Sequence, residues 1–438
     1  MLHVLGNPTY RRLYMAQVIA LIGTGLCTVA LGLLAYELAG ANAGMVLGTA
    51  LAIKMIANVV IAPIAAAFAE RVPRRAMLVT LDLIRAAVAV ALPFVTQIWE
   101  VFVLIFLLQA ASASFTPTFQ ATIPDVLPDE RDYTRALSLS RLAYDLESVV
   151  SPILAAALLT VISFHGIFGG TVVGFLASAA FVVSVTLPSP KPAAPRGIYE
   201  RTTRGIRIYL ATPRLRGLLA LNFGVACAGA MVFVNTVLIV QSGFGLDQQA
   251  AAWALAAFGG GSILAALSLP PLLDRFPVRK TMMSGAGLLC VALLAGVMLN
   301  GYGQLLVLWF VFGLGYSLVL TPSGQLLRRS SHPEDRPALF AAQFALSHAC
   351  WLATYPLAGW LGALIGLPAT FVVLGLAAAT AMVVATLFWP AGDPDVVTHT
   401  HYGLDPDHPH LHDAVAAGPG HRHAHGFVID NHHPVWPR

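Results

Sequence analysis

The chain has 438 residues, of which 57% are hydrophobic and only 11% are charged, and its mean hydropathy is +0.75. Soluble domains carry about 25% charged residues, so the composition excludes a water-soluble enzyme. The formal net charge of +4 comes with no basic stripe interleaved with aromatic residues, so we expect no nucleic-acid partner.

Apolar runs of about 20 residues recur from the N-terminus to Pro390. Because a backbone in lipid must satisfy its own hydrogen bonds, each run is predicted to be a transmembrane helix. We therefore predict an all-α integral membrane protein. The twelve predicted spans are 13–36, 44–68, 76–96, 100–120, 137–162, 167–187, 216–240, 250–273, 281–299, 303–322, 338–363 and 368–389.

The Lys and Arg residues lie almost entirely on one side of this predicted topology. Of the 25, only Lys54, Arg85 and Arg141 fall inside predicted spans, and the others lie in alternate connections or terminal segments. Since Lys and Arg accumulate in cytoplasmic loops, we predict that both termini are cytoplasmic.

A repeat of about 204 residues relates the two parts of the chain. Glu70-Arg71-Val72-Pro73-Arg74-Arg75 follows the second span, and Asp274-Arg275-Phe276-Pro277-Val278-Arg279-Lys280 follows the eighth. Six spans are thus duplicated with the same orientation, as in many transporters. The predicted units are an N-terminal six-helix half at 1–187, a cytoplasmic linker at 188–215, a C-terminal six-helix half at 216–390 and a cytoplasmic tail at 391–438.

These duplicated halves and their acidic-Arg-x-x-Arg-Arg/Lys loops resemble the major facilitator superfamily over about residues 8 to 390. The sequence contains no GxxxxGK[ST] phosphate-binding loop. We therefore expect a secondary transporter driven by an ion gradient, with no cofactor, and not an enzyme. The resemblance also implies a latch for the cytoplasmic gate in the outward-facing state, formed by Glu70, Arg71, Arg75, Asp274 and Arg275.

Ionisable side chains inside the predicted spans need a partner or a function, because each costs about 3 kcal/mol on insertion scales. Asp82 and Arg85 are three residues apart in span three and are predicted to form an ion pair that supports the gate. In span five, Arg141 and Asp145 can pair along one helix face, whereas Glu147 points about 200° away from Asp145. An unpaired carboxylate suits a proton carrier or a cation ligand. Either Asp145 or Glu147 is the predicted carrier, and a polar partner from a neighbouring helix is the alternative for Glu147.

Polar residues on other spans complete the predicted proton-coupling and substrate path. His348 of span eleven is either a core residue or a ligand. Lys54 and Asn58 share one face of span two, and Lys54 either repels a bound cation or pairs with a carboxylate. Tyr144 of span five and Asn235 of span seven are further candidates.

The tail after Pro390 is rich in His, Asp, Pro and Gly, which predicts a segment that is disordered without metal. Its His-x-His steps place imidazoles on one side of an extended chain, so several nitrogens can reach one ion. Imidazole without thiolate favours Ni²⁺, Co²⁺, Zn²⁺ or Cu²⁺ over Cu⁺. An inert tail is the alternative. The predicted metal-binding residues are His399, His401, His408, His410, His412, His421, His423, His425, His432 and His433.

A transporter fold with a histidine-rich cytoplasmic tail resembles the nickel-resistance exporters, a bacterial branch of the superfamily. The resemblance implies a multi-pass protein of the inner membrane that exports Ni²⁺, or next Co²⁺, by proton antiport and alternating access. The tail would capture cytosolic metal, and the lipid bilayer, the metal and the proton would be the partners, with no obligatory protein partner. The alternatives are a proton-coupled exporter of drugs or siderophores with an incidental tail, and a membrane-anchored metal buffer or sensor that does not transport.

Overall fold

A computed structural model describes residues 2–61, 72–187, 198–332, 335–393, 396–401, 411–412, 414–430, 433 and 435–436. Twelve long helices lie within these ranges and follow the predicted order of spans. Helix α6 begins at residue 130 and α5 ends at 126, so both extend beyond the predicted spans. The twelve are α1 (Pro8–Ala39), α2 (Ala43–Ile56, continued by η3, Ala57–Ile61), α4 (Arg74–Ala91), α5 (Ile98–Val126), α6 (Glu130–Leu158), α7 (Phe164–Val183), α9 (Pro213–Leu238, continued by η5, Ile239–Gly243), α10 (Gln248–Arg275), α11 (Val278–Ala295), α12 (Tyr302–Leu320), α14 (Arg336–Ile365) and α15 (Leu367–Phe388).

Nine stretches of the described chain are long and apolar enough to cross a membrane. The first of them covers both α1 and α2, while α6 and α14 are outside the nine. Helix α6 is less apolar than these nine stretches, because its sequence carries Arg141, Asp145 and Glu147 among its apolar residues. Mean hydropathy alone does not identify a span with this many charges. The duplication of six spans between the two halves still indicates that it is one.

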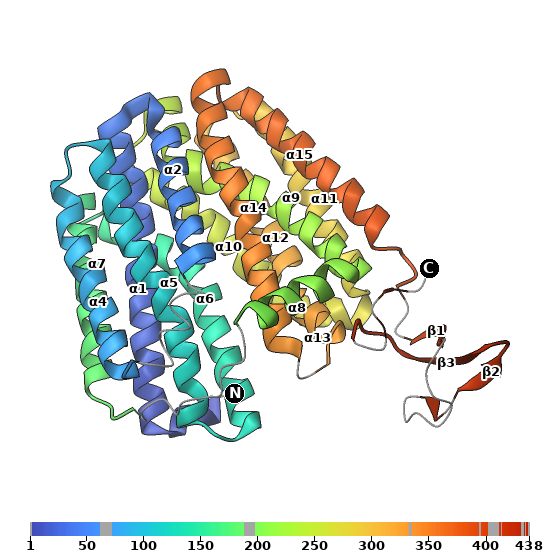
Figure 1. The fold of residues 1–438 in the computed structure, drawn as a ribbon. Helices are drawn as coiled ribbons and strands as arrows, with labels where there is room; N and C mark the ends of the chain where they lie inside the picture. Colours follow the sequence, from blue (N-terminus) through green and yellow to red (C-terminus); the bar gives the residue numbers. More distant parts are fainter. Residues whose placement is uncertain are drawn as a thin grey trace.

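The helices form two groups that meet along α2, α6, α10 and α14 (Figure 1). Helices α1 to α7 make up one half and α9 to α15 the other. Helix α2 packs on α14, and α6 packs on α10. A shorter helix, α8 (Ile198–Ala211), lies against the start of α14, where Arg204 and Asp335 form an ion pair of 2.6 Å. The contacts between the halves are thus concentrated on two helix pairs, the arrangement needed for one half to rock against the other.

Small residues let α2 and α14 approach each other closely. A Cβ atom at Gly359 would overlap the carbonyl group of Gly44, so the two backbones are in direct contact. Asn235 of α9 is fully buried beside them, and its Nδ2 donates a hydrogen bond of 3.2 Å to the carbonyl oxygen of Ala358. Close backbone approach through small residues is how membrane helices gain packing energy in the absence of a hydrophobic drive.

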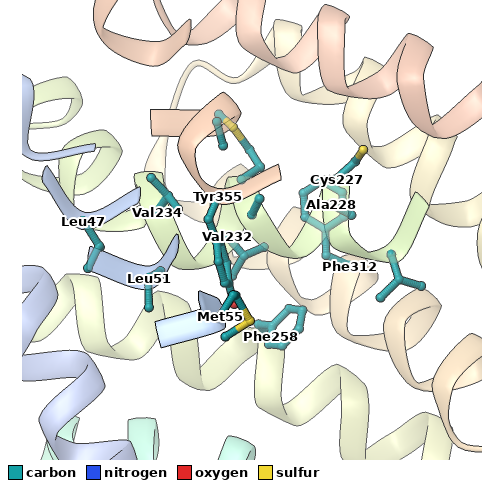
Figure 2. Packing of buried hydrophobic residues seen from close by; sticks show 14 of the residues in the cluster. Leu47, Leu51, Met55, Cys227, Ala228, Val232, Val234, Phe258, Phe312 and Tyr355 are labelled. Atoms are coloured by element: carbon teal, nitrogen blue, oxygen red, sulfur yellow. The ribbon is translucent and has the colours of Figure 1, made fainter. Parts of the chain in front are cut away.

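Apolar side chains fill the space beside this crossing. A single cluster of buried apolar residues runs through both halves, and a second lies within the N-terminal half. Because the first cluster includes side chains from both halves, the contact between them is largely apolar. Figure 2 shows part of this cluster, including Leu47, Leu51 and Met55 of α2, Val232 and Val234 of α9, Phe258 of α10 and Tyr355 of α14.

The described part of the tail forms a small antiparallel sheet, which corrects the prediction of disorder. Its strands are β1 (Val396–His401), β2 (Val415–Ala417) and β3 (Gly420–Gly426), in the order β1-β3-β2. The alternation of His with Thr, Arg and Ala has a period of two, which is the repeat of a strand. Phe427 and Ile429, directly after β3, are buried in the same apolar cluster as the C-terminal half. The polar composition of the tail as a whole concealed this short apolar anchor.

We predict that Gly359→Ala destabilises the structure, because the added methyl group would overlap the Gly44 backbone. Overpacking of this kind costs about 1–3 kcal/mol. Gly301→Ala is the matched control, because nothing lies within 4 Å of a Cβ atom at that position. Thermal unfolding of the two purified variants in detergent measures the difference, and equal midpoints for Gly359→Ala and the control would contradict close packing of α2 on α14.

Candidate substrate path and histidine cluster

Glu147 lies inside the N-terminal half, where α6 packs on α1. A Cβ atom at Gly25 of α1 would lie 2.6 Å from Oε1 of Glu147 and would overlap the hydroxyl group of Ser151. Gly25 therefore provides the space that the carboxylate occupies. The side chains of Arg141 and Asp145, for which an ion pair along the helix is predicted, lie outside the described residues.

Lys54 of α2 is the positive charge that acts on the Glu147 carboxylate. Both side chains are described, and no ion pair within 4.0 Å joins them. Lys54 also lines a cavity of about 10 Å³ between α1, α2 and α5, together with Thr24, Cys27 and Gln109. This volume is room for about one water molecule. In this conformation the space beside Lys54 accommodates a water molecule or an ion, and not an organic molecule.

Tyr144 links α6 to the helices on either side of it. Its hydroxyl oxygen lies 2.9 Å from Oγ1 of Thr116 on α5, and it also hydrogen-bonds Gln17 of α1. Gln17 accepts a second hydrogen bond, of 3.0 Å, from the hydroxyl group of Ser140. These bonds fix the rotation of α6 one turn before Glu147. Sequence reasoning named Tyr144 as a site residue but did not predict its partners Gln17 and Thr116.

The ion pair between Asp82 and Arg85 is formed and buried in the N-terminal half. Ser178 of α7 donates a hydrogen bond of 2.7 Å to the second oxygen of Asp82. The Arg85 guanidinium lies 4.3 Å from the ring centre of Phe115 and 4.5 Å from that of Phe175. The pair thus ties α4 to α5 and α7, and its role in supporting the gate stays a prediction.

Three other candidates for the path occupy different surroundings. Asn58 is half-buried in η3, the π-helical end of α2. Asn235 lies in the α2–α14 crossing, between the halves. His348 of α14 is partly exposed, and its Nδ1 is 2.7 Å from the carbonyl oxygen of Phe344. The centres of the two rings lie 3.8 Å apart, with the ring planes tilted by 33°. The roles of these residues in transport stay predictions.

The described gate residues make contacts within their own half or lie on the surface. Arg75 donates to the carbonyl oxygen of Val183 on α7, while Asp274 and Arg275 are exposed at the end of α10. Glu70 and Arg71 lie outside the described residues. A latch in the outward-facing state, as implied by family resemblance, stays a prediction for these positions.

Four tail histidines converge on one point. One ligand nitrogen from each of His399, His423, His425 and His433 lies within 4.8 Å of the others. The register of the sheet accounts for three of them, because His399 on β1 pairs with His423 on β3 and His425 follows on the same face. His433 joins them from the segment after β3. Of the remaining predicted ligands, His408, His410 and His432 lie outside the described residues, whereas His401, His412 and His421 lie within them.

Hydrogen bonds orient three of these four imidazoles. Nδ1 of His399 lies 3.0 Å from the carbonyl oxygen of Val397, and Nδ1 of His425 lies 2.8 Å from that of Gly426. Nδ1 of His433 lies 2.9 Å from a carboxylate oxygen of Asp430. Bonds of this type fix the tautomer of metal-binding histidines and leave Nε2 for the ion. Burial lowers the pKa of His399, and it lowers the pKa of His433 to about 4 despite the opposing effect of Asp430, so both rings are neutral at pH 7.

A second carboxylate attaches the beginning of the tail to the C-terminal half. Asp393 accepts hydrogen bonds from Arg329 at 3.1 Å and from the indole of Trp389 at 3.0 Å. It also lies 3.6 Å from the Arg214 guanidinium, which is buried. The Arg214 guanidinium in turn lies 5.0 Å from the ring centre of Trp436, near the C-terminus. Sequence reasoning missed Asp393, because a lone Asp after the last span carries no motif.

The sequence matches the Major Facilitator Superfamily over residues 13–247 and 218–408. The chain belongs to this superfamily. A bacterial homologue of the human lysosomal transporter Spinster, in an inward-facing and unoccupied conformation, is similar in fold with a TM-score of 0.67 and 14% identity over 87% of this chain and 96% of that one. A POT family transporter in complex with 5-aminolevulinic acid is similar with a TM-score of 0.68 and 12% identity over 88% of this chain and 96% of that one. The predicted multi-pass, twelve-helix secondary transporter is thus confirmed, and it is not an enzyme.

Two relatives are similar in sequence as well. The MFS-type transporter YfiS of Bacillus subtilis is 24% identical over 300 residues, which are 63% of this chain and 68% of YfiS. Macrolide efflux protein A of Streptococcus pyogenes is 25% identical over 181 residues, which are 40% of this chain and 44% of that protein. The likeness to the macrolide transporter therefore covers less than half of either chain.

We predict that Asp82→Asn strongly destabilises the transporter, because it leaves the buried Arg85 charge without its counterion. Removing one member of a buried pair costs about 3–5 kcal/mol. Asp132→Asn is the matched control, because the ion pair of Asp132 with Arg135 is largely exposed and such pairs contribute about 0–1 kcal/mol. The thermal unfolding midpoint in detergent should fall far more for Asp82→Asn. A fall no greater than that of the control would show that Arg85 does not depend on this carboxylate.

Proposed function

We propose that this transporter exports a divalent metal cation from the cytoplasm, Ni²⁺ first and Co²⁺ second, in exchange for protons. The observation that carries the proposal is the convergence of four tail imidazoles on one point. The four ligands are imidazole nitrogens, with no thiolate and no carboxylate among them. Such a ligand set suits late divalent ions such as Ni²⁺, Co²⁺, Zn²⁺ and Cu²⁺, whereas Mg²⁺ and Ca²⁺ prefer oxygen ligands. The tail would collect the ion at the inner mouth and raise its local concentration there.

The N-terminal half supplies a group suited to proton coupling. The Glu147 carboxylate faces α1 in a space made by Gly25, with Lys54 as the nearby charge and no ion pair within 4.0 Å between the two described side chains. A carboxylate held this way in a span is available to bind a proton or a cation in turn. Asp145 on the same helix remains the second candidate, and Tyr144, Arg141, His348, Lys54, Asn58 and Asn235 complete the proposed path.

The arrangement of the halves fits alternating access in an inner membrane of bacteria. The Lys and Arg distribution supports cytoplasmic termini, and with that orientation the Gly44–Gly359 contact would lie toward the outer face. The proposed outer closure lies in this contact. In the proposed cycle, metal enters from the cytoplasm while the outer contact is closed, and the latch of Glu70, Arg71, Arg75, Asp274 and Arg275 forms after the halves rock.

A second candidate function is export of an organic compound with an incidental tail. The similarity to macrolide efflux protein A favours it. Competition by unlabelled Co²⁺ and by a macrolide for the same transport activity separates the two candidates.

We predict that proteoliposomes holding the intact transporter accumulate Ni²⁺ when a proton gradient is imposed, and that Glu147→Gln abolishes this uptake. Gln keeps the size of the side chain and removes its ability to release a proton. Glu37→Gln is the matched control, because Glu37 is exposed and only 3.9 Å from His165 in a weak pair. Gradient-dependent uptake of a macrolide with no flux of Ni²⁺, Co²⁺ or Zn²⁺ would instead support the organic exporter.

We predict that a chain ending at Asp393 transports Ni²⁺ with reduced apparent affinity and an undiminished maximal rate. Collection of the ion is the proposed role of the tail, so loss of the tail should be compensated at high Ni²⁺ concentration. The truncation keeps Asp393, because removing it would leave the buried Arg214 without this carboxylate. Initial rates of uptake across a range of Ni²⁺ concentrations measure both quantities, and an unchanged apparent affinity would exclude a capturing role for the tail.

A further inference from the structure

Three imidazole nitrogens of the tail cluster converge on a single nitrogen of His399. Nε2 of His399 lies 3.1 Å from Nε2 of His423, 3.0 Å from that of His433 and 3.0 Å from that of His401. A neutral imidazole has one N–H donor and one acceptor nitrogen. Since Nδ1 of His399 is the nitrogen that faces a carbonyl oxygen, its Nε2 carries the lone pair. One lone pair does not make three good hydrogen bonds at once.

The contact between His399 and His433 is the clearest case. Nδ1 of His433 faces the Asp430 carboxylate, so its Nε2 also carries a lone pair. Two lone pairs therefore point at each other across 3.0 Å. Such an arrangement is repulsive unless a cation lies between the two nitrogens.

The spacing fits a metal ion in that position. Nitrogens about 2.0–2.1 Å from a common ion lie about 2.9 Å apart at neighbouring positions of a square-planar or octahedral site, and about 3.3 Å apart in a tetrahedron. The distances of 3.0 and 3.1 Å from His399 to its neighbours lie between these values. All four ligand nitrogens lie within 4.8 Å of one another, so one ion fits once the rings close in around it.

The same cluster is joined to the body of the transporter through Asp430. One oxygen of Asp430 accepts from His433, and the other lies 3.2 Å from Nε2 of His332, in the connection between α13 (Ser323–Arg329) and α14. Phe427 adds an apolar link, because its ring lies 4.9 Å from that of His399 and 4.7 Å from that of His433 and is buried in the core cluster. The orientation of a proposed ligand thus depends on a residue outside the tail.

We propose that His399, His423, His425 and His433 bind one divalent late transition-metal ion, and that filling this site fixes the tail on the C-terminal half through Asp430 and His332. The proposal rests on the proposed function in taking the transported metal as the ion that fills the site. It goes further in naming a single site among the ten tail histidines and in linking its occupancy to docking of the tail.

Calorimetric titration of the full-length protein in detergent with Ni²⁺ alone tests the site. We expect one tight equivalent in the wild type, its loss in His399→Ala, and its retention in His412→Ala, which removes a tail histidine outside the four. His425→Gln is the second variant, since it removes a ligand without shortening the side chain to a methyl group, and gel filtration checks the fold of each protein. Equal binding by His399→Ala and His412→Ala would overturn the single site.

His332→Ala tests the docking, because His332 is not among the four ligands. We expect the Ni²⁺ affinity of this variant to fall by about tenfold. Loss of a residue that orients a metal ligand typically lowers metal affinity by about 10- to 100-fold, and tenfold is the lower end of that range. Ni²⁺ should also slow trypsin cleavage after Arg422, an exposed residue of β3, in the wild type and less so in His332→Ala. Unchanged affinity in His332→Ala, or no protection by Ni²⁺ in the wild type, would overturn the link.

These experiments separate failure of the inference from failure of the proposed function, because binding and proteolysis need no flux. Tight binding and protection without Ni²⁺ transport would refute the export function and support the site. Proton-driven Ni²⁺ transport by a protein that lacks the tight equivalent would do the reverse.

Discussion

The free energy needed to hold a charge in an apolar bilayer constrains the packing of the N-terminal half. An ionised side chain costs about 3 kcal/mol at the centre of a span, so it persists where neighbouring helices supply its partners. Arg85 receives Asp82 from its own helix and two aromatic faces from α5 and α7, and Ser178 satisfies the carboxylate from the far side. Glu147 receives space beside Gly25 and the field of Lys54, with no ion pair within 4.0 Å between the two described side chains. The first arrangement holds helices together, whereas the second suits a group that exchanges a proton or a cation.

The cost of burying charge also bears on the composition of the tail. Its converging side chains are imidazoles, which are neutral when deprotonated, so assembling them requires no buried charge. Their lone pairs then face one another, and the repulsion between them is relieved by a cation. Asp430 is hydrogen-bonded to Nδ1 of His433, so it orients the His433 ring and leaves Nε2 as the proposed ligand atom. The bilayer thus selects for paired charges, whereas the tail brings together neutral donors that suit the proposed ion.

The sequence predicted the helices well, because apolar run length and the positions of Lys and Arg are properties of single segments. It also predicted the Asp82–Arg85 pair, since three residues of helix bring two side chains together. The neighbours of Glu147 were not predictable, because Gly25 and Lys54 meet it only after α1, α2 and α6 have taken their rotations. The tail was assigned to disorder from its average composition, which hid the anchor at Phe427 and Ile429. Its four converging histidines follow from strand register, and register depends on a turn that composition does not encode.

Helix α14 connects these separate features. Near one end it carries Gly359, which rests on the Gly44 backbone, and at the other it begins beside His332 and pairs with α8 through Asp335. Its 30 residues span about 45 Å, and Pro356 interrupts its backbone hydrogen bonds between the two ends. If metal in the tail favours one position of this helix, then by linkage the position of the helix alters the affinity of the tail for metal by the same factor. On the proposed function, a tail site that binds more tightly while the outer contact is closed would be filled when the cytoplasmic mouth is open.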